Sequence, residues 1–266
     1  MSIVTLTTDF GLKDGNVGVM KGVIWRIAPR AHIADLSHQI TPQNIAEAAL
    51  VLARSAPYFP PDAVHIVVVD PGVGTPRRPI AARIGEQQFV GPDNGFLTPL
   101  LEQAEKEHLD TEFIHLNRPQ FWLPAVSHVF HGRDIFAPVG GHLASGMPLL
   151  ALGSRITDPL RLSLPRPQET AGGWLGQIIH IDHFGNLSTN LKAEDLGDCS
   201  SLTIQLRDAE IPGLYHTFGE LPPGSLMALL GSTGSLIISQ VNGSAALTLG
   251  ARVGDPVQVT LHTNPS

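Results

Sequence analysis

The sequence is poor in cysteine and has no long apolar run. Its single cysteine, Cys199, cannot form an intrachain disulfide, which excludes a disulfide-stabilised scaffold. No stretch approaches the roughly 20 apolar residues of a membrane-spanning helix. The opening MSIVTLTTDF has neither the basic start nor the apolar core of a signal peptide. We therefore expect a cytoplasmic protein that does not bind a membrane.

Basic charge is also scarce. The 17 Lys and Arg residues are outnumbered by 24 Asp and Glu residues, which gives a formal net charge of -7. Binding to a nucleic-acid backbone normally needs a basic excess, so we expect no nucleic-acid partner. The chain lacks a P-loop, and GVGTPRR does not complete the G-x-G-x-x-G fingerprint. A nucleotide phosphate is therefore not the expected ligand.

Hydrophobic residues make up 42% of the 266 residues, and the length allows two packed domains. Residues 3–6 and 64–69 are apolar runs rich in β-branched side chains, which is typical of strands buried on both faces of a parallel sheet. Each run leads to an aspartate, Asp9 or Asp70. The carboxyl ends of such strands are where open α/β domains bind their ligands.

Helical patterns alternate with these strands. Thr41-Pro42 predicts an N-cap and first helical residue, and helical spacing continues from there to Pro60. A second helix is expected over residues 97–107. The alternation of strand and helix predicts an open, Rossmann-like α/β sheet domain.

The pattern changes near Pro165, where proline, glycine and polar residues indicate a linker. We place the boundary there, with an N-terminal domain at residues 1–164 and a C-terminal domain at residues 165–266. Short apolar runs separated by turn residues predict that the second domain is all-β and barrel-like. These runs are GQIIHID, SLTIQL, SLMALLG, SLIISQ and DPVQVTL.

Candidate catalytic residues cluster in VVVDPGVGTPRR and FHGRDIFAP. A carboxylate, a guanidinium and an imidazole can together hold and polarise a water molecule, which points to Asp70, Arg77 and His131. Turn chemistry alone also explains an aspartate followed by proline and glycine, so a structural role for Asp70 stays open. A metal site made of His128, His131 and Asp134 is the weaker alternative, because a third convincing ligand is lacking. We expect no metal.

Asp9 suits a different task. A carboxylate near a strand end can accept hydrogen bonds from a pair of sugar hydroxyls, as an acidic residue does in dinucleotide sites. Asp9 comes too early in the chain for the dinucleotide fingerprint itself. A nucleoside without phosphates would fit.

Together the motifs resemble one family. TLTTDFG, DPGVGTPRR, GPDNG, FHGRDIFAPV, DHFGN and GSTGSLIISQVNGSAA occur in the order found in the S-adenosyl-L-methionine (SAM) hydroxide adenosyltransferases, or SAM hydrolases, relatives of the SAM-dependent fluorinase and chlorinase. The resemblance implies an α/β domain joined to a barrel-like domain, in a homotrimer with SAM bound between subunits. It implies hydrolysis of SAM to adenosine and L-methionine, with SAM as substrate and no cofactor.

The resemblance also assigns site residues. It places Asp70, Arg77 and His131 on the attacking water, and its spacing alone selects Arg77 over the adjacent Arg78. It implies that Asp9 holds the ribose hydroxyls. The residues that it places around the methionine or adenosine portions are Asp182, Phe184, Asn186 and Ser232, with Asn242 at the adenine edge.

Two further functions remain to be separated from hydrolysis. One is a SAM- or adenosine-binding sensor without turnover, and the other is a SAM-dependent halogenase. A pure binder needs none of the three candidate catalytic residues. A halide beside Asp70 would be repelled by the carboxylate, so this residue favours water as the nucleophile.

Overall fold

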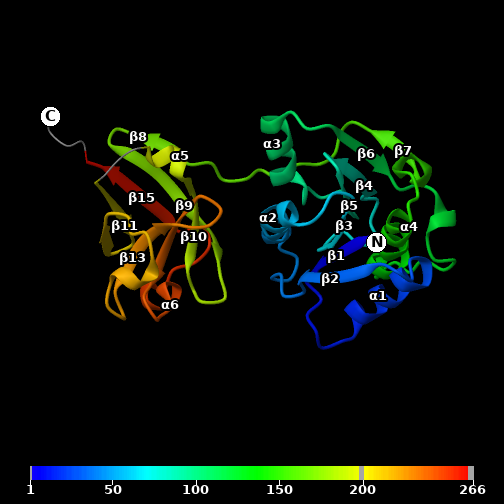
Figure 1. Cartoon of the computed structure of the whole chain (residues 1–266), viewed down its shortest axis with the longest axis horizontal. Helices are drawn as coiled ribbons and strands as arrows, with labels where there is room; N and C mark the ends of the chain where they lie inside the picture. The colour runs from blue at the N-terminus through cyan, green and yellow to red at the C-terminus, as the bar shows by residue number, and fades with distance from the viewer. Residues whose placement is uncertain (1, 198–200, 263–266) are drawn as a thin grey trace. The chain divides into compact units, whose positions relative to one another are not determined.

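The computed structural model describes residues 2–197 and 201–262, so Cys199 lies outside the described residues. The chain divides into two compact units, Met1–Ser163 and Leu164–Ser266. Figure 1 shows the first as a sheet with helices and the second as strands almost throughout. An α/β unit followed by a barrel-like β unit confirms the expected fold class.

The N-terminal unit is built on a seven-stranded sheet with the strand order β2-β1-β3-β5-β4-β6-β7. Strands β2, β1, β3 and β5 run parallel to one another, and the pairs β5–β4, β4–β6 and β6–β7 are antiparallel. The strands are β1 (Ile3–Thr8), β2 (His32–Ser37), β3 (Val64–Val68), β4 (Pro79–Ile84), β5 (Gln87–Pro92), β6 (Thr111–His115) and β7 (Ser154–Ile156).

The antiparallel half differs from the parallel sheet that the apolar runs indicated. Only Gly85 and Glu86 separate β4 from β5. Two residues can close a hairpin between antiparallel strands, whereas a parallel connection needs a crossover of a dozen or more residues. The short connection therefore sets the direction of β4, and β6 and β7 add to its free side.

Helices cover both faces of this sheet (Figure 1). Helices α1 (Asn16–Ile27) and α4 (Ala137–Ala144) pack on the face that carries Val4, Leu6 and Ile66. Helices α2 (Ile45–Ser55) and α3 (Thr98–Glu107) pack on the opposite face. Short helical turns complete the unit: η1 (Ala56–Tyr58), η2 (Pro119–Phe121), the π-helical η3 (Gly132–Phe136) and η4 (Leu149–Leu152). With both faces covered, the strands are mostly apolar, and buried polar side chains within them, such as Thr5 and His65, contact each other.

Helix α2 begins later than Thr41-Pro42 predicts. Its N-cap is Asn44, whose side chain accepts a hydrogen bond from the Glu47 amide at 3.0 Å. Gln43 has a φ of 66°, a left-handed conformation that cannot belong to a right-handed helix. The Gln43 amide instead donates to Asp9, so the residues before α2 belong to the strand-end loops.

The C-terminal unit is an antiparallel sheet with the order β12-β11-β15-β9-β10-β14-β13, with β8 paired to β9. Tyr215 bridges to Leu229 of β13 and thereby nearly closes the sheet into a barrel. Its strands are β8 (Gln168–Thr170), β9 (Gly173–Ile181), β10 (Leu187–Lys192), β11 (Leu202–Leu206), β12 (Ala209–Pro212), β13 (Leu226–Leu230), β14 (Ser235–Gln240) and β15 (Pro256–Leu261). Its short helices are α5 (Ala193–Leu196), η5 (Phe218–Glu220) and α6 (Ala245–Leu249).

The barrel interior is filled by side chains that alternate along the strands. Ile204 of β11, Ile238 of β14 and Val257 and Val259 of β15 are fully buried in it. All the apolar runs expected in this half form strands, and β8, β10 and β12 are additional. Within the described part of both units, no helix has the length and apolarity needed to cross a membrane.

Candidate active site

Asp70 and Arg77 form a buried ion pair in the turn that follows β3. Arg77 Nε donates to Asp70 Oδ1 at 2.9 Å and to Oδ2 at 3.1 Å, and Arg77 Nη2 also donates to Oδ2. Only 5% of the Asp70 side chain and 10% of the Arg77 side chain are exposed. Several charge-assisted hydrogen bonds in so little water hold both groups in one geometry.

His131 joins this pair through the arginine. Arg77 Nη2 lies 2.8 Å from His131 Nδ1, and the Arg77 guanidinium lies 5.1 Å from the centre of the Phe136 ring. A guanidinium is only a donor, so Nδ1 must accept this bond and Nε2 carries the proton of the neutral ring. The arginine thus connects the carboxylate with the imidazole and selects the tautomer of His131.

The surroundings of His131 favour its neutral form. Burial lowers the pKa of His131 below its ordinary value of 6.5, and the nearby positive charge of Arg77 lowers it further, against opposing effects of Asp70 and Asp134. His131 is the residue from which the π-helical turn η3 starts, directly before α4. Such turns often occur at functional sites.

Gly74 brings the two loops of the site together. Its φ is 77°, and a Cβ placed on it would lie 2.3 Å from the carbonyl oxygen of His128. Only glycine allows both this conformation and this approach. The turn that carries Asp70 is therefore in direct backbone contact with the segment that leads to His131.

Arg78 faces different partners from Arg77. Its Nε donates to Asp93 at 2.8 Å, and its Nη1 donates to Asp158 at 2.9 Å. These ion pairs connect the start of β4 to the end of β5 and to the segment after β7. Of the two adjacent arginines, only Arg77 contacts Asp70 and His131 in the described contacts of these residues.

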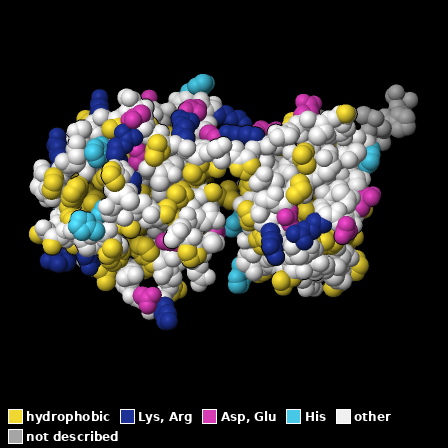
Figure 2. All heavy atoms as spheres, turned by 180° about the vertical axis from the view of Figure 1, so that it is seen from behind, with side chains coloured by type: hydrophobic (Ala, Val, Ile, Leu, Met, Phe, Trp, Pro, Cys, Tyr) yellow, Lys and Arg dark blue, Asp and Glu magenta, His cyan; other side chains and the backbone are white. Residues whose placement is uncertain are grey.

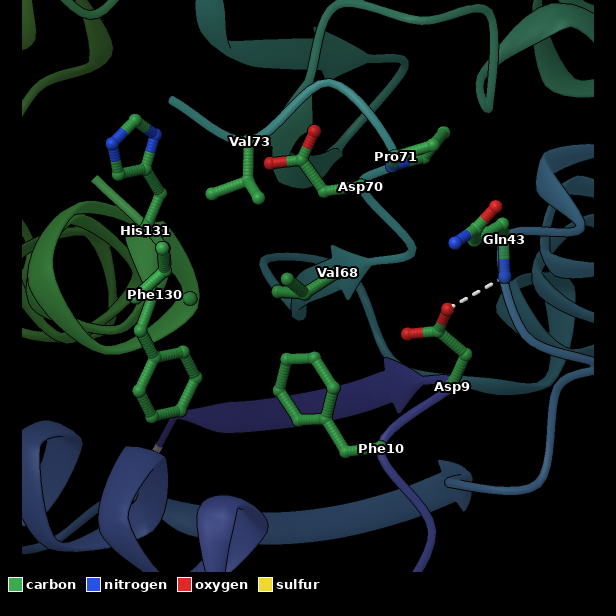
Figure 3. Close-up of a pocket in the computed structure, with 11 residues that line it drawn as sticks. Asp9, Phe10, Gln43, Val68, Asp70, Pro71, Val73, Phe130 and His131 are labelled. Carbon is green, nitrogen blue, oxygen red and sulfur yellow. Dashed lines mark hydrogen bonds between the residues drawn. The ribbon is translucent and has the colours of Figure 1, made fainter. Parts of the chain in front are cut away.

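A cavity of about 260 Å³ lies at the carboxyl ends of β1 and β3. Figure 3 shows Asp9, Asp70 and His131 around it, with Phe10, Val68 and Phe130 along one side. The rings of Phe10 and Phe130 meet edge to face at 5.5 Å. The full lining is Asp9, Phe10, Gln43, Val68, Asp70, Pro71, Val73, Val129, Phe130, His131 and Gly132. Arg77 is not among the lining residues, but it contacts two of them, Asp70 and His131.

Asp9 reaches the same cavity from the end of β1. Its Oδ2 accepts a hydrogen bond from the Gln43 amide at 2.8 Å. Its other carboxylate oxygen points into the cavity (Figure 3). One oxygen is thus anchored, and the other is available to a ligand.

Two of the three residues considered for a metal site, His131 and Asp134, are engaged in other contacts. Asp134 is fully buried and accepts from Arg133 Nε at 2.6 Å and from the Ser127 amide at 2.8 Å. Burial alone would raise the pKa of Asp134, but hydrogen bonds from Arg133 and Ser127 outweigh it and lower the pKa. Among the described residues, no group of three or more His, Cys, Asp and Glu side chains could hold a metal ion.

In the C-terminal unit, DHFGN forms the turn between β9 and β10. Asp182 Oδ1 accepts from the amides of Phe184 and Asn186, each at 2.9 Å, and its Oδ2 accepts from Asn186 Nδ2 at 2.8 Å. The Asp182 carboxylate therefore organises its own turn. This turn leaves the Phe184 side chain 72% exposed, so Phe184 is not a core residue within this unit.

Asn242 and Ser232 lie at opposite ends of β14. Asn242 is exposed, with a φ of 52°, in the loop that leads to α6. This loop adjoins the DHFGN turn, because the Ala246 amide donates to the Gly185 carbonyl at 3.0 Å. Ser232 is exposed in the turn between β13 and β14. One extended ligand would have to run along β14 to contact both residues.

Several residues that line the cavity were not predicted from the sequence. Phe10 and Phe130 belong to the motifs TLTTDFG and FHGRD, in which the polar residues carry the predicted chemistry. Gln43 falls within the predicted helix, and its left-handed conformation gives no signal in the sequence.

Comparisons with known proteins identify the same family for the N-terminal and the C-terminal unit. Residues 4–153 match the family model described as SAM hydroxide adenosyltransferase N-terminal domain, and residues 176–258 match the model of its C-terminal domain. The chain is 39% identical over 261 residues to an (R)-S-adenosyl-L-methionine hydrolase of Salinispora tropica, with 97% of each chain covered. It is 38% identical to the protein of the same name from Thermus thermophilus, over 97% of this chain and 100% of that relative.

More distant relatives and solved structures extend this picture. A fluorinase of Nocardia brasiliensis is 29% identical, over 97% of this chain and 96% of the relative. The crystal structure of an uncharacterized conserved protein from Thermotoga maritima matches with a TM-score of 0.88 and 35% identity, over 97% of this chain and 99% of that one. The chain therefore belongs to the SAM hydroxide adenosyltransferase family.

Proposed function

We propose that this protein hydrolyses SAM to adenosine and L-methionine through attack of water on ribose C5′. The observation that carries the proposal is the hydrogen-bonded set of Asp70, Arg77 and His131, two of which line the same cavity as Asp9. The curated relatives named (R)-S-adenosyl-L-methionine hydrolase support the same substrate and reaction. SAM carries its own leaving group, so the proposal includes no cofactor.

The reaction needs a nucleophile rather than an activated leaving group. The sulfonium of SAM weakens the C5′–S bond, and methionine departs with the bonding electron pair as a neutral thioether. Water forms the new C5′–O bond in line with the departing sulfur and loses one proton. Holding this water in the attacking geometry supplies a large part of the rate enhancement.

The geometry favours Asp70 as the group that accepts this proton. His131 Nδ1 already accepts from Arg77, and its Nε2 carries a proton, so the neutral ring can donate to the water but cannot take its proton. Asp70 lines the cavity as an acceptor. Arg77, which contacts both residues, is assigned the roles of orienting the carboxylate and holding the His131 tautomer.

The remaining assignments follow the shape of the substrate. Asp9 is proposed to bind the ribose hydroxyls through its free oxygen. Phe184, Asn186 and Asn242, at one end of the barrel, are proposed to surround the adenine, and Ser232, at the other end of β14, the methionine portion. Asp182 contributes by shaping the turn that carries Phe184 and Asn186.

We also propose a cytoplasmic homotrimer with SAM bound between subunits. Large apolar side chains at both sets of site residues are exposed, including Val129 at 79%, Phe184 at 72% and Leu247 at 85%. Figure 2 shows hydrophobic side chains gathered on the visible face of the N-terminal unit. Exposed apolar patches of this kind typically mark association surfaces. Sedimentation equilibrium of the purified protein measures its oligomeric state.

The alternatives are separated by product analysis. Purified protein is incubated with SAM in halide-free buffer and then in chloride, and the products are separated by chromatography. Adenosine and methionine in both buffers support the hydrolase. A chlorinated nucleoside would instead indicate a halogenase, and tight SAM binding without any product would indicate a sensor. Loss of activity on exhaustive chelation would instead support the alternative of a metal-dependent hydrolase.

The pH dependence gives an independent check on His131. Protonation of Nδ1 would remove the acceptor for Arg77, so only neutral His131 fits this site. Because burial and Arg77 lower its pKa, we expect kcat/KM to fall only as the pH drops through a midpoint below 6.5. Initial rates between pH 5 and 8, with folding monitored by circular dichroism, test this; a midpoint at or above 6.5 would contradict the geometry.

A further inference from the structure

We infer that His38 is a positioning residue that acts through Thr8 to hold the loop carrying Asp9, and so determines recognition of the ribose hydroxyls. The inference rests on the proposed function, because that proposal assigns the ribose to Asp9. His38 follows β2, and Thr8 is the last residue of the neighbouring parallel strand β1. Neither residue lines the cavity.

His38 lies in a chain of polar contacts that runs from the buried end of β1 across the edge strand β2 to α1. Its Nδ1 lies 2.9 Å from Thr8 Oγ1, and its Nε2 lies 3.0 Å from Asp35 Oδ1. Asp35 Oδ2 accepts from Lys21 Nζ of α1 at 2.7 Å. Only 3% of the His38 side chain is exposed, so its contact with the buried Thr8 is protected from water, whereas Asp35 is 39% exposed. The hydrogen-bond contact of the imidazole is therefore the one with Thr8, since Nε2, although within ion-pair distance of Asp35, makes no hydrogen bond among the described residues.

The same histidine holds the loop after β1 at two points. Thr8 Oγ1 accepts from the Phe10 amide at 3.3 Å, and the His38 carbonyl accepts from the Gly11 amide at 2.8 Å. Asp9 lies between these two attachments. Its Oδ2 is fixed from the other side by the Gln43 amide, which leaves its free oxygen directed into the cavity. Loss of the contact between Thr8 and His38 would release one side of this loop.

The chain provides a matched control in the preceding residue. Thr7 and Thr8 are both fully buried in β1. Thr7 Oγ1 has no hydrogen-bond partner among the described residues, whereas Thr8 Oγ1 contacts His38 and the Phe10 amide. Valine has nearly the shape of threonine and lacks the hydroxyl. Thr8→Val therefore removes the contacts with His38 and the Phe10 amide. Thr7→Val makes the same chemical change but removes no hydrogen bond among the described residues.

The test measures binding of adenosine and of 2′,3′-dideoxyadenosine by isothermal titration calorimetry with the full-length protein. We expect Thr8→Val to weaken adenosine about tenfold, the size of effect that one lost buried hydrogen bond produces. The dideoxy compound, which lacks both hydroxyls, should bind the wild type and both variants within about twofold of one another. Thr7→Val should leave both affinities within the same margin.

Substitutions of His38 provide a second comparison. Asparagine can keep a polar atom near the position of Nδ1, and glutamine near that of Nε2. His38→Asn should therefore retain more adenosine affinity than His38→Gln, because only the contact with Thr8 reaches the loop. Asp9→Asn combined with Thr8→Val should lose little more affinity than Asp9→Asn alone, since both changes act on one contact.

The outcomes distinguish this inference from the proposed function. An equal loss for adenosine and the dideoxy compound in Thr8→Val would show a general structural role and overturn the inference, as would an equal loss in Thr7→Val. A wild type that binds adenosine no better than the dideoxy compound would also overturn it. If the predicted selectivity is found in a protein that does not turn over SAM, the inference stands and the hydrolase proposal fails.

Discussion

Asp70→Asn should reduce the rate of adenosine formation by roughly three orders of magnitude, within the range typical of a lost general base. The amide keeps the shape of the side chain and one acceptor for Arg77, but it is a far weaker base than the carboxylate. The substitution leaves Asp9 and the apolar lining residues Phe10, Val68 and Phe130 unchanged. The dissociation constant of SAM should therefore change by less than about threefold. Single-turnover chromatography and calorimetry measure the two quantities.

The neighbouring ion pair supplies the control for this prediction. Asp158→Asn makes the same chemical change on a partner of Arg78, at a side chain that is 74% exposed. Its turnover should stay within about twofold of the wild type, since an exposed ion pair contributes little stability. If Asp70→Asn lost affinity for SAM as strongly as it lost rate, Asp70 would be a binding residue and the proton would need another acceptor.

Acidification should destabilise the protein through His65, in the core of the N-terminal unit. His65 is fully buried, stacks on Phe89 at 5.0 Å between ring centres and lies 2.8 Å from Thr5 Oγ1. Burial lowers the pKa of His65 to about 4 from its ordinary value of 6.5. Below pH 6.5, His65 is therefore protonated in the unfolded chain but stays neutral in the folded protein. This contribution to stability is complete above pH 6.5 and is lost as the pH falls towards 4.

The predicted effect is large enough to measure by urea unfolding. Between pH 7.5 and pH 5, this one histidine should lower the free energy of unfolding by about 2 kcal/mol. His65→Asn keeps a polar atom near Thr5 and removes the titrating group, so its loss between the two pH values should be smaller by that amount. Equal losses in the variant and the wild type would mean that His65 is not the group responsible.

The strands that carry the site residues could be predicted from the sequence, whereas the contacts among those residues could not. The apolar runs before Asp9 and Asp70 were recognisable as strands because both faces of the sheet are covered. Strand direction beyond β5 was not, since it depends on a short hairpin through Gly85 and Glu86. Strand β10 was not predicted either, because its sequence LSTNLK, directly after the DHFGN motif, contains no continuous apolar run.

Which of the adjacent residues Arg77 and Arg78 contacts Asp70 could not be derived from the residue pattern alone. Adjacent residues in an extended segment point to opposite sides, so the sequence implies that the two arginines separate. It does not state which one meets Asp70. That depends on the turn through Gly74 and on His131, which is distant in sequence and close only in the folded chain. The same holds for His38 and Thr8, which parallel pairing of β1 and β2 brings together.

The contact between Gly74 and the His128 carbonyl has a consequence for protein engineering. The loop that carries Asp70, the proposed proton acceptor, and the loop that carries the His131 imidazole approach each other at the level of the backbone. Residues on the second loop can be exchanged to accommodate a bulkier nucleophile only if the carbonyl of residue 128 keeps its place. A library that varies side chains at 126 and 129 but preserves loop length should therefore yield more active variants than one that inserts or deletes a residue there.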